Sequence, residues 1–191
     1  MNSRLTIGVA EDEADMQEFY RFVVPELGYN LLWVVRDGVD MVKQCEQSRP
    51  DLLIADVKMP RLDGIDAVRS IASHNHLPVI LVTGYYDEET VRRAEVAQVS
   101  NYLIKPIREA DLNAAIRFTV QQFENLESLR DDQQHETITR AAHALANGSG
   151  MSNEQAYYRL EQIAVQENRQ LVEVAETILA AAELWETDST D

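Results

Sequence analysis

Five short apolar runs that alternate with helix-like stretches constrain the fold of the first 110 residues more than any other feature. The runs are continuous and do not alternate with polar residues, which is typical of parallel strands in a sheet covered on both faces. Strand–helix alternation of this kind predicts a doubly wound α/β domain with a five-stranded parallel sheet. The expected strands are residues 5–10, 31–35, 52–55, 79–82 and 102–104, and the expected helices are about 14–27, 38–47, 65–74, 87–97 and from 109 onward.

Polar side chains follow four of these runs. Asp56 comes directly after the third run, and Glu11 and Asp12 come after the first. Thr83 follows the fourth run and Lys105 follows the fifth. A carboxylate at the end of a buried strand is costly unless it is solvated, paired or functional. Because functional groups in doubly wound sheets gather at the carboxyl ends of the strands, these residues are expected to share one site.

The residue types at this edge suit one kind of chemistry. Glu11, Asp12 and Asp56 would repel one another, and a hard divalent cation such as Mg²⁺ would relieve that repulsion. An aspartate can act as the nucleophile toward a phosphoryl group. A lysine and a hydroxyl, here Lys105 and Thr83, can stabilise the charge on the phosphoryl oxygens. The pattern therefore predicts metal-assisted phosphorylation of Asp56.

Several short motifs accompany these residues in a fixed order. They are Glu11-Asp12, Asp56 followed by Met59-Pro60, Asp63-Gly64, Thr83-Gly84, Tyr102 and Lys105-Pro106. With these motifs, residues 4 to about 120 resemble the receiver domain of bacterial response regulators. The resemblance implies a flavodoxin-like fold and a sensor histidine kinase as the source of the phosphoryl group on Asp56.

The same resemblance implies roles for individual residues. Thr83 and Lys105 would stabilise the phosphoryl group, and Thr83 and Tyr102 would form the switch pair that responds to it. The Lys105–Pro106 peptide would be cis. The metal ligands implied for Mg²⁺ are Glu11, Asp12, Asp56 and the backbone carbonyl of Lys58.

Other polar residues near the motifs have simpler interpretations. Asp63 before Gly64 is interpreted as a turn residue. Glu13 and Asp15 are interpreted as acids that begin a helix, where they favour the helix dipole. For Tyr102, ordinary packing on the sheet stays open as an alternative to a switch role.

From Asp111 the chain is helical throughout. An apolar seam with four-three spacing comprises Leu112, Ile116, Thr119, Phe123 and Leu126, and it weakens into polar residues after that. The seam could pack on its own domain or form a homodimer through the helix from Leu112, and the pattern leaves both open. These features predict a receiver domain over 1–120 and a helical linker or coiled coil over 121–136.

The last region is expected to be a small three-helix domain over 137–185, followed by a polar tail over 186–191. A glycine-containing stretch at 147–150 stops the first helix. Ser152 and Gln155 form a capping box that begins the second helix, and a break near Asn168 precedes the third.

Composition limits the partners of this chain. It has 17 lysines and arginines against 33 acidic residues, a net charge of -16, which disfavours general binding to nucleic acid or anionic membranes. From residue 131 onward there are three arginines, no lysine and twelve acids, so duplex DNA is not an expected partner. No run of about 18 apolar residues and no signal peptide is present, so a cytoplasmic location without membrane attachment is expected.

Residues 138–179 carry a second pattern. Its members are Ala141, Leu145, Gly150, Met151, Ser152, Glu154, Ala156, Tyr157, Leu160, Ala164, Asn168, Leu171, Ala175, Ile178 and Leu179. This segment resembles the ANTAR domain, a three-helix RNA-binding unit of transcription antiterminators. The resemblance implies a dimer that binds hairpin loops in nascent RNA and prevents terminator formation once Asp56 is phosphorylated.

The candidate RNA contacts are few. Tyr158 could stack on a base, and Arg140, Arg159 and Arg169 could contact phosphates. Basic residues that the family often has are replaced, for example by Glu161. The alternative is therefore a response regulator whose acidic helical output binds a protein partner instead of RNA. No second nucleophile–base set is apparent, so the chain is not expected to be an enzyme.

Overall fold

The computed structural model describes residues 4–72, 77–84, 92–93 and 99–188. The chain divides into two compact units, Met1–Glu124 and Asn125–Asp191. Each unit has its own apolar core.

The first unit is built on a five-stranded parallel sheet with strand order β2-β1-β3-β4-β5. This confirms the doubly wound sheet expected from the apolar runs. Each observed strand lies within one residue of its expected bounds, because a buried parallel strand needs an apolar run of its own length. The strands are β1 (Thr6–Ala10), β2 (Asn30–Val35), β3 (Leu52–Asp56), β4 (Val79–Thr83) and β5 (Asn101–Ile104).

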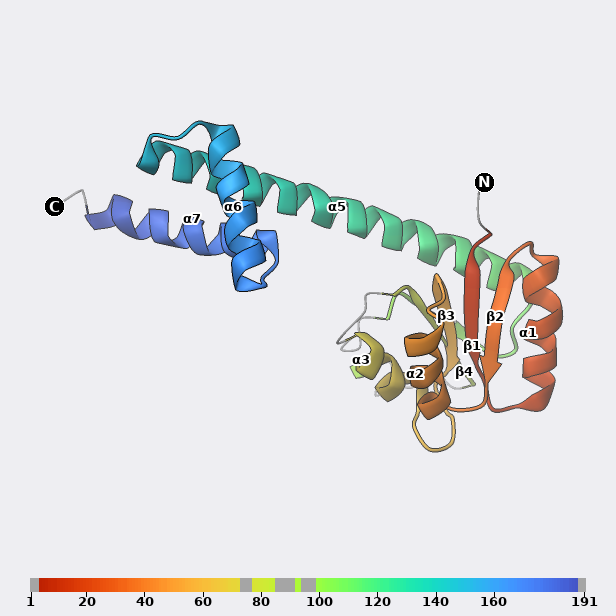
Figure 1. Ribbon diagram of the computed structural model, residues 1–191. Coiled ribbons are helices and arrows are strands. Elements are labelled where there is room, and N and C mark those ends of the chain that lie inside the picture. Colours follow the sequence, from red (N-terminus) through yellow and green to blue (C-terminus); the bar gives the residue numbers. More distant parts are fainter. Residues whose placement is uncertain (1–3, 73–76, 85–91, 94–98, 189–191) are drawn as a thin grey trace. The chain divides into compact units, whose positions relative to one another are not determined.

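Helices cover both faces of the sheet. The helices α1 (Ala14–Glu26) and the start of α5 (Glu109–Ser149) share an apolar core with one face. The helices α2 (Gly38–Gln47) and α3 (Gly64–Ala72) share a core with the other, and Figure 1 shows α1 on the opposite side of the strands from α2 and α3. The helix expected over 87–97 lies outside the described residues, apart from residues 92–93.

The beginning of α5 belongs to the core of the first unit. Leu112, Ile116 and Thr119 are each 0% exposed, so this part of the seam packs on its own domain. The seam therefore cannot present these three side chains to a second copy. The helix itself runs for 41 residues without a break, through the whole of 121–136.

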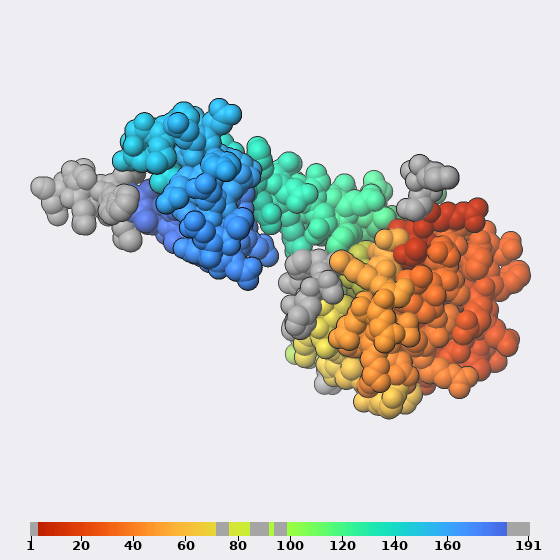
Figure 2. All heavy atoms as spheres, in the orientation of Figure 1, coloured from red at the N-terminus to blue at the C-terminus, as the bar shows by residue number. Residues whose placement is uncertain are grey.

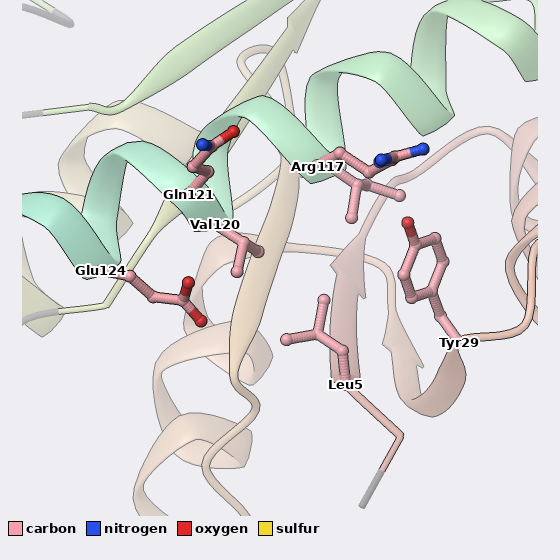
Figure 3. A pocket seen from close by; sticks show the side chains of 7 residues that line it. Leu5, Tyr29, Arg117, Val120, Gln121 and Glu124 are labelled. Carbon is pink, nitrogen blue, oxygen red and sulfur yellow. The ribbon is translucent and has the colours of Figure 1, made fainter. Parts of the chain in front are cut away.

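A shallow groove of about 430 Å³ lies beside α5 in the first unit (Figure 3). Leu5 precedes β1 and Tyr29 precedes β2, so the groove lies at the amino-terminal edge of the sheet. The Tyr29 hydroxyl donates to Asn113 Oδ1 of α5 at 3.0 Å. The remaining lining residues are Ile116, Arg117, Val120, Gln121 and Glu124.

The second unit packs the end of α5 against α6 (Asn153–Glu167) and α7 (Leu171–Asp188), and Figure 2 shows α6 and most of α7 in blue. The expected capping box at Ser152 and Gln155 is confirmed, because each side chain bonds the backbone N–H of the other. Asn168 ends α6 in the left-handed conformation, with φ of 52°. No helix within the described ranges is long and apolar enough to cross a membrane.

Candidate functional site

The strand order brings the expected site residues to one edge of the sheet. Glu11 follows β1, Asp56 ends β3, Thr83 ends β4 and Lys105 follows β5. β1 pairs with β3, β3 with β4 and β4 with β5, so the four residues stand at the carboxyl ends of neighbouring strands. Asp12 comes one residue after Glu11 and completes the set.

Three carboxylates form a cluster at this edge. One oxygen from each of Glu11, Asp12 and Asp56 lies within 4.8 Å of the others. Glu11 is 0% exposed and Asp56 is 6% exposed, whereas Asp12 is open to solvent. The cluster therefore has a buried base and an accessible rim, which suits a cation that keeps some of its water.

Among the described residues, the charge of Glu11 is only partly balanced. Burial, with the nearby charge of Asp56, raises the pKa of Glu11 to about 7, although Lys105 acts to lower it. Glu11 Oε2 is buried and has no hydrogen-bond partner among the described residues. An unpaired buried carboxylate oxygen is costly, and a divalent cation at this cluster would satisfy it. The residues present thus fit a metal ion.

Lys105 is the cation that the protein itself supplies. Its Nζ lies 2.9 Å from Asp56 Oδ2, 3.0 Å from Glu11 Oε1 and 3.1 Å from Glu13 Oε1. Burial disfavours the charged amine, but the hydrogen bonds to these three carboxylates outweigh it and raise the pKa of Lys105. The lysine is therefore fully charged at neutral pH. The Lys105–Pro106 peptide is cis, as expected.

Glu13 is a site residue that the sequence interpretation missed. It stands at the N-cap position of α1, but its side chain makes no capping hydrogen bond within the described structure. The carboxylate pairs with Lys105 instead. Nothing in the sequence shows this pairing, because Glu13 and Lys105 are 92 residues apart and meet only when β1 and β5 end at the same edge. Asp15 does lie in the first turn of α1, as expected.

The loop after β3 holds Asp56 in place. The Lys58 backbone N–H donates to Asp56 Oδ1 at 3.4 Å, and the Gly64 N–H donates to the Val57 carbonyl at 3.0 Å. A Cβ on Gly64 would lie 2.0 Å from the Asp56 carbonyl oxygen, so only glycine fits there. Asp63 accepts from the Asp66 N–H at 2.9 Å and pairs with Arg93 at 2.6 Å, so it caps the start of α3 and is not the turn residue interpreted from the sequence.

The two expected switch residues lie on neighbouring strands. Thr83 is 7% exposed at the end of β4, and Tyr102 is 47% exposed on β5. Tyr102 pairs in register with Leu81, two residues before Thr83, so the Thr83 and Tyr102 side chains project from the same face of the sheet.

The expected RNA contacts in the second unit differ in their surroundings. Arg140, Tyr158 and Arg159 are exposed, and Tyr158 is 63% exposed. Arg169 is bound within the unit: its guanidinium bonds Glu167 at 3.0 Å and the Thr177 hydroxyl at 2.9 Å, which ties the end of α6 to α7. All four candidates therefore have side chains at the surface of the unit, and Arg169 is in addition held by contacts within it.

Comparisons of the sequence point to one family. The family model of the response regulator receiver domain matches residues 7–117. The transcriptional regulatory protein PdtaR of Mycobacterium tuberculosis is 32% identical over 179 residues, which cover 90% of this chain and 87% of PdtaR. The cyclic di-GMP phosphodiesterase response regulator RpfG of Xanthomonas campestris is 28% identical, over 76% of this chain and 44% of RpfG.

Solved structures agree with the fold of the first unit. The signal receiver domain of a modulated diguanylate cyclase from Desulfovibrio desulfuricans superposes with a TM-score of 0.60 at 27% identity, over 64% of this chain and 98% of that one. The receiver domain of the response regulator NarL from Mycobacterium tuberculosis gives 0.60 at 18% identity, over 62% and 98%, which shows the fold alone. With this sheet order and the family match over 7–117, the chain belongs to the response regulators and carries an N-terminal receiver domain.

Proposed function

We propose that Asp56 accepts a phosphoryl group from a sensor histidine kinase, and that the C-terminal helices then bind hairpin RNA and control transcription antitermination. The observation that carries the first part is Asp56 Oδ2 at 2.9 Å from Lys105 Nζ, within a carboxylate cluster that fits a divalent cation. The second part rests on the ANTAR-like residues of the tail and on the likeness to PdtaR, a transcriptional regulatory protein, over 90% of this chain.

The chain's own residues would share the work of phosphoryl transfer. A carboxylate oxygen of Asp56 attacks phosphorus, and Lys105 and the Thr83 hydroxyl stabilise the phosphoryl oxygens. Glu11, Asp12 and Asp56, with the Lys58 carbonyl, would hold Mg²⁺, which supplies charge neutralisation at the phosphoryl group. The burial of Glu11 and Asp56 keeps the nucleophile and a neighbouring metal-ligand candidate in fixed positions, and Lys105 is their counter-charge.

The conformational change on phosphorylation would be transmitted through the sheet face that carries Thr83 and Tyr102. Phosphorylation draws Thr83 toward Asp56, and Tyr102 moves into the space that Thr83 leaves. The helix α5 is in the core of the receiver domain through Leu112 and Ile116, and the same helix continues to Ser149. A change in the receiver core therefore has a continuous helix through which to reach the output helices.

The output would recognise RNA loops mainly by stacking. Tyr158 offers an exposed ring, and the neighbouring Arg159 and the exposed Arg140 offer charge for phosphates. A homodimer would bring two such sets together. Because Leu112, Ile116 and Thr119 are buried in the receiver core, the dimer would use the exposed side of α5 instead, with Phe118, Leu126 and Leu129 exposed by 59%, 51% and 59%.

Binding of RNA to the full-length protein tests this function. The phosphorylated protein should bind an RNA with two hairpins at least ~10-fold more tightly than an unpaired RNA of equal length, at fixed salt. Asp56→Asn, treated with the same phosphodonor, is the matched control and should lack the gain. Equal binding of both RNAs by the phosphorylated protein would refute the antitermination proposal.

A second candidate is a protein partner for the acidic output. It is motivated by the twelve acidic residues from 131 onward and by the exposed Val165, which is 82% exposed on α6. A purified partner that binds full-length protein only when Asp56 is phosphorylated, with no gain for hairpin RNA, would favour this alternative.

A further inference from the structure

Glu13 holds an unexpected position at the rim of the site. Its side chain is 63% exposed, yet its Oε1 lies 3.1 Å from Lys105 Nζ. It is not part of the carboxylate cluster that fits the metal ion, which consists of Glu11, Asp12 and Asp56. Glu13 is thus a carboxylate that contacts the lysine without being required by the metal.

The three carboxylates use the whole donor capacity of Lys105. An ammonium group has three N–H donors, and Nζ has three carboxylate partners at 2.9–3.1 Å, on Asp56, Glu11 and Glu13. An incoming phosphoryl group brings further anionic oxygens that need the same donors. Glu13 therefore competes with the phosphoryl group for Lys105.

The negative charge of Glu13 opposes binding of an anionic phosphodonor, as its use of a Lys105 donor does. Glu13 places a negative charge beside the lysine on its solvent-exposed side, and an anionic phosphodonor that approaches Lys105 from solvent meets this charge. The carboxylate offsets part of the attraction of Lys105 and repels the donor. Because Glu13 is exposed, salt should weaken this repulsion.

We propose that Glu13 is a positioning residue that restrains Lys105 and slows the loading of Asp56 by anionic phosphodonors. This inference rests on the proposed phosphorylation of Asp56. In the step concerned, an Asp56 carboxylate oxygen forms a bond to phosphorus and the bond from phosphorus to the donor's leaving group breaks. The leaving group keeps the electron pair and takes a proton from water.

The test compares loading rates of full-length variants with phosphoramidate and Mg²⁺, followed by intact-protein mass spectrometry. Glu13→Gln removes the charge and keeps an acceptor oxygen, whereas Glu13→Ala removes the acceptor as well and frees one Lys105 donor. Asp15→Asn is the matched control, since it removes one charge from the first turn of the same helix and Asp15 is not among the three ion-pair partners of Lys105. Glu13→Gln should load about 3- to 10-fold more efficiently at low salt, as expected for one unit charge a few ångströms away.

Two features of the result separate an electrostatic restraint from a merely structural role. The gain should lie mostly in the donor concentration needed for half-maximal rate, and it should shrink at high salt. It should also be larger for dianionic acetyl phosphate than for monoanionic phosphoramidate. Glu13→Ala should show at least the same gain, and both variants should keep the wild-type unfolding midpoint.

The outcomes distinguish this inference from the proposed function. Equal or slower loading of Glu13→Gln relative to Asp15→Asn would overturn the role of Glu13 and leave Asp56 as the acceptor. Loading of Asp56→Asn at the wild-type rate would overturn the proposed function itself.

Discussion

Glu11 should make the metal-free protein less stable as pH rises. Its pKa is about 7 in the folded state, against 4.5 for an unperturbed glutamate. Between these two values the folded state binds more protons than the unfolded state, so the free energy of unfolding falls with rising pH. The contribution of Glu11 to the free energy of unfolding is highest below about pH 4.5, decreases up to about pH 7, and then levels off.

The size of the effect follows from the two pKa values. At about 1.36 kcal/mol for each pKa unit, the gap corresponds to on the order of 3 kcal/mol. The Glu11 side chain is 0% exposed, so water screens little of this cost. The unpaired Oε2 agrees with a cost of this kind, because ionisation places charge on an atom that has no partner within the described residues.

Urea unfolding at several pH values, with a chelator present, measures this loss. Tryptophan fluorescence in a Trp185→Phe background would follow Trp33, which lies on β2 of the receiver domain. Glu11→Gln is the control, and it should remove most of the decrease between pH 5 and about 7. Mg²⁺ should restore stability to the wild type near pH 8. A wild-type curve that is flat over this range, or that matches the Glu11→Gln curve, would refute the reasoning.

Three further predictions concern the site and the output helices. Gly64→Ala should lower the free energy of unfolding of the receiver domain in urea by about 1–3 kcal/mol, because its Cβ would meet the Asp56 carbonyl oxygen. Gly148→Ala, which lies in open space on α5, is the control and should be neutral or stabilising; equal losses in the two variants would contradict this. Ser152→Ala should cost about 1 kcal/mol by loss of the capping box, seen as a lower thermal midpoint of the second unit, and an unchanged midpoint would contradict it. Lys105→Met should tighten Mg²⁺ binding about 3- to 10-fold, because Glu11, Glu13 and Asp56 lose their counter-charge. Titration calorimetry measures the dissociation constant, and weaker binding would contradict the assigned geometry.

Much of the receiver domain could be predicted because each buried strand must be apolar along its whole length. The run 52–55 places Asp56 at its end, and the parallel topology then brings that end beside Glu11 and Lys105. The capping box is equally local, because Ser152 and Gln155 are three residues apart and each side chain bonds the backbone N–H of the other. Interactions within one element, or at the ends of paired strands, can be predicted from the order of residues.

Other features could not be predicted from the sequence, because they depend on contacts between residues that are far apart along the chain or that have several possible partners. The seam of α5 left its partner undecided, and only the packed structure shows Leu112 and Thr119 buried against the receiver sheet. The contact between Glu13 and Lys105 depends on the positions of the segments that follow β1 and β5. The bonds of Arg169 to Glu167 and Thr177 arise from how α6 turns into α7, and its contact with RNA phosphates stays a prediction. Long side chains at loop ends have many partners within reach, so sequence spacing alone does not select among them.

The measurement that tests the central proposal most directly is peptide-level mass spectrometry of the full-length protein after incubation with phosphoramidate and Mg²⁺. We predict one phosphoryl group, located on Asp56, that is absent from Asp56→Asn and strongly reduced when the divalent cation is chelated. A phosphoryl group on another residue, or unchanged loading of Asp56→Asn, would contradict the assignment of Asp56 as the phosphate acceptor.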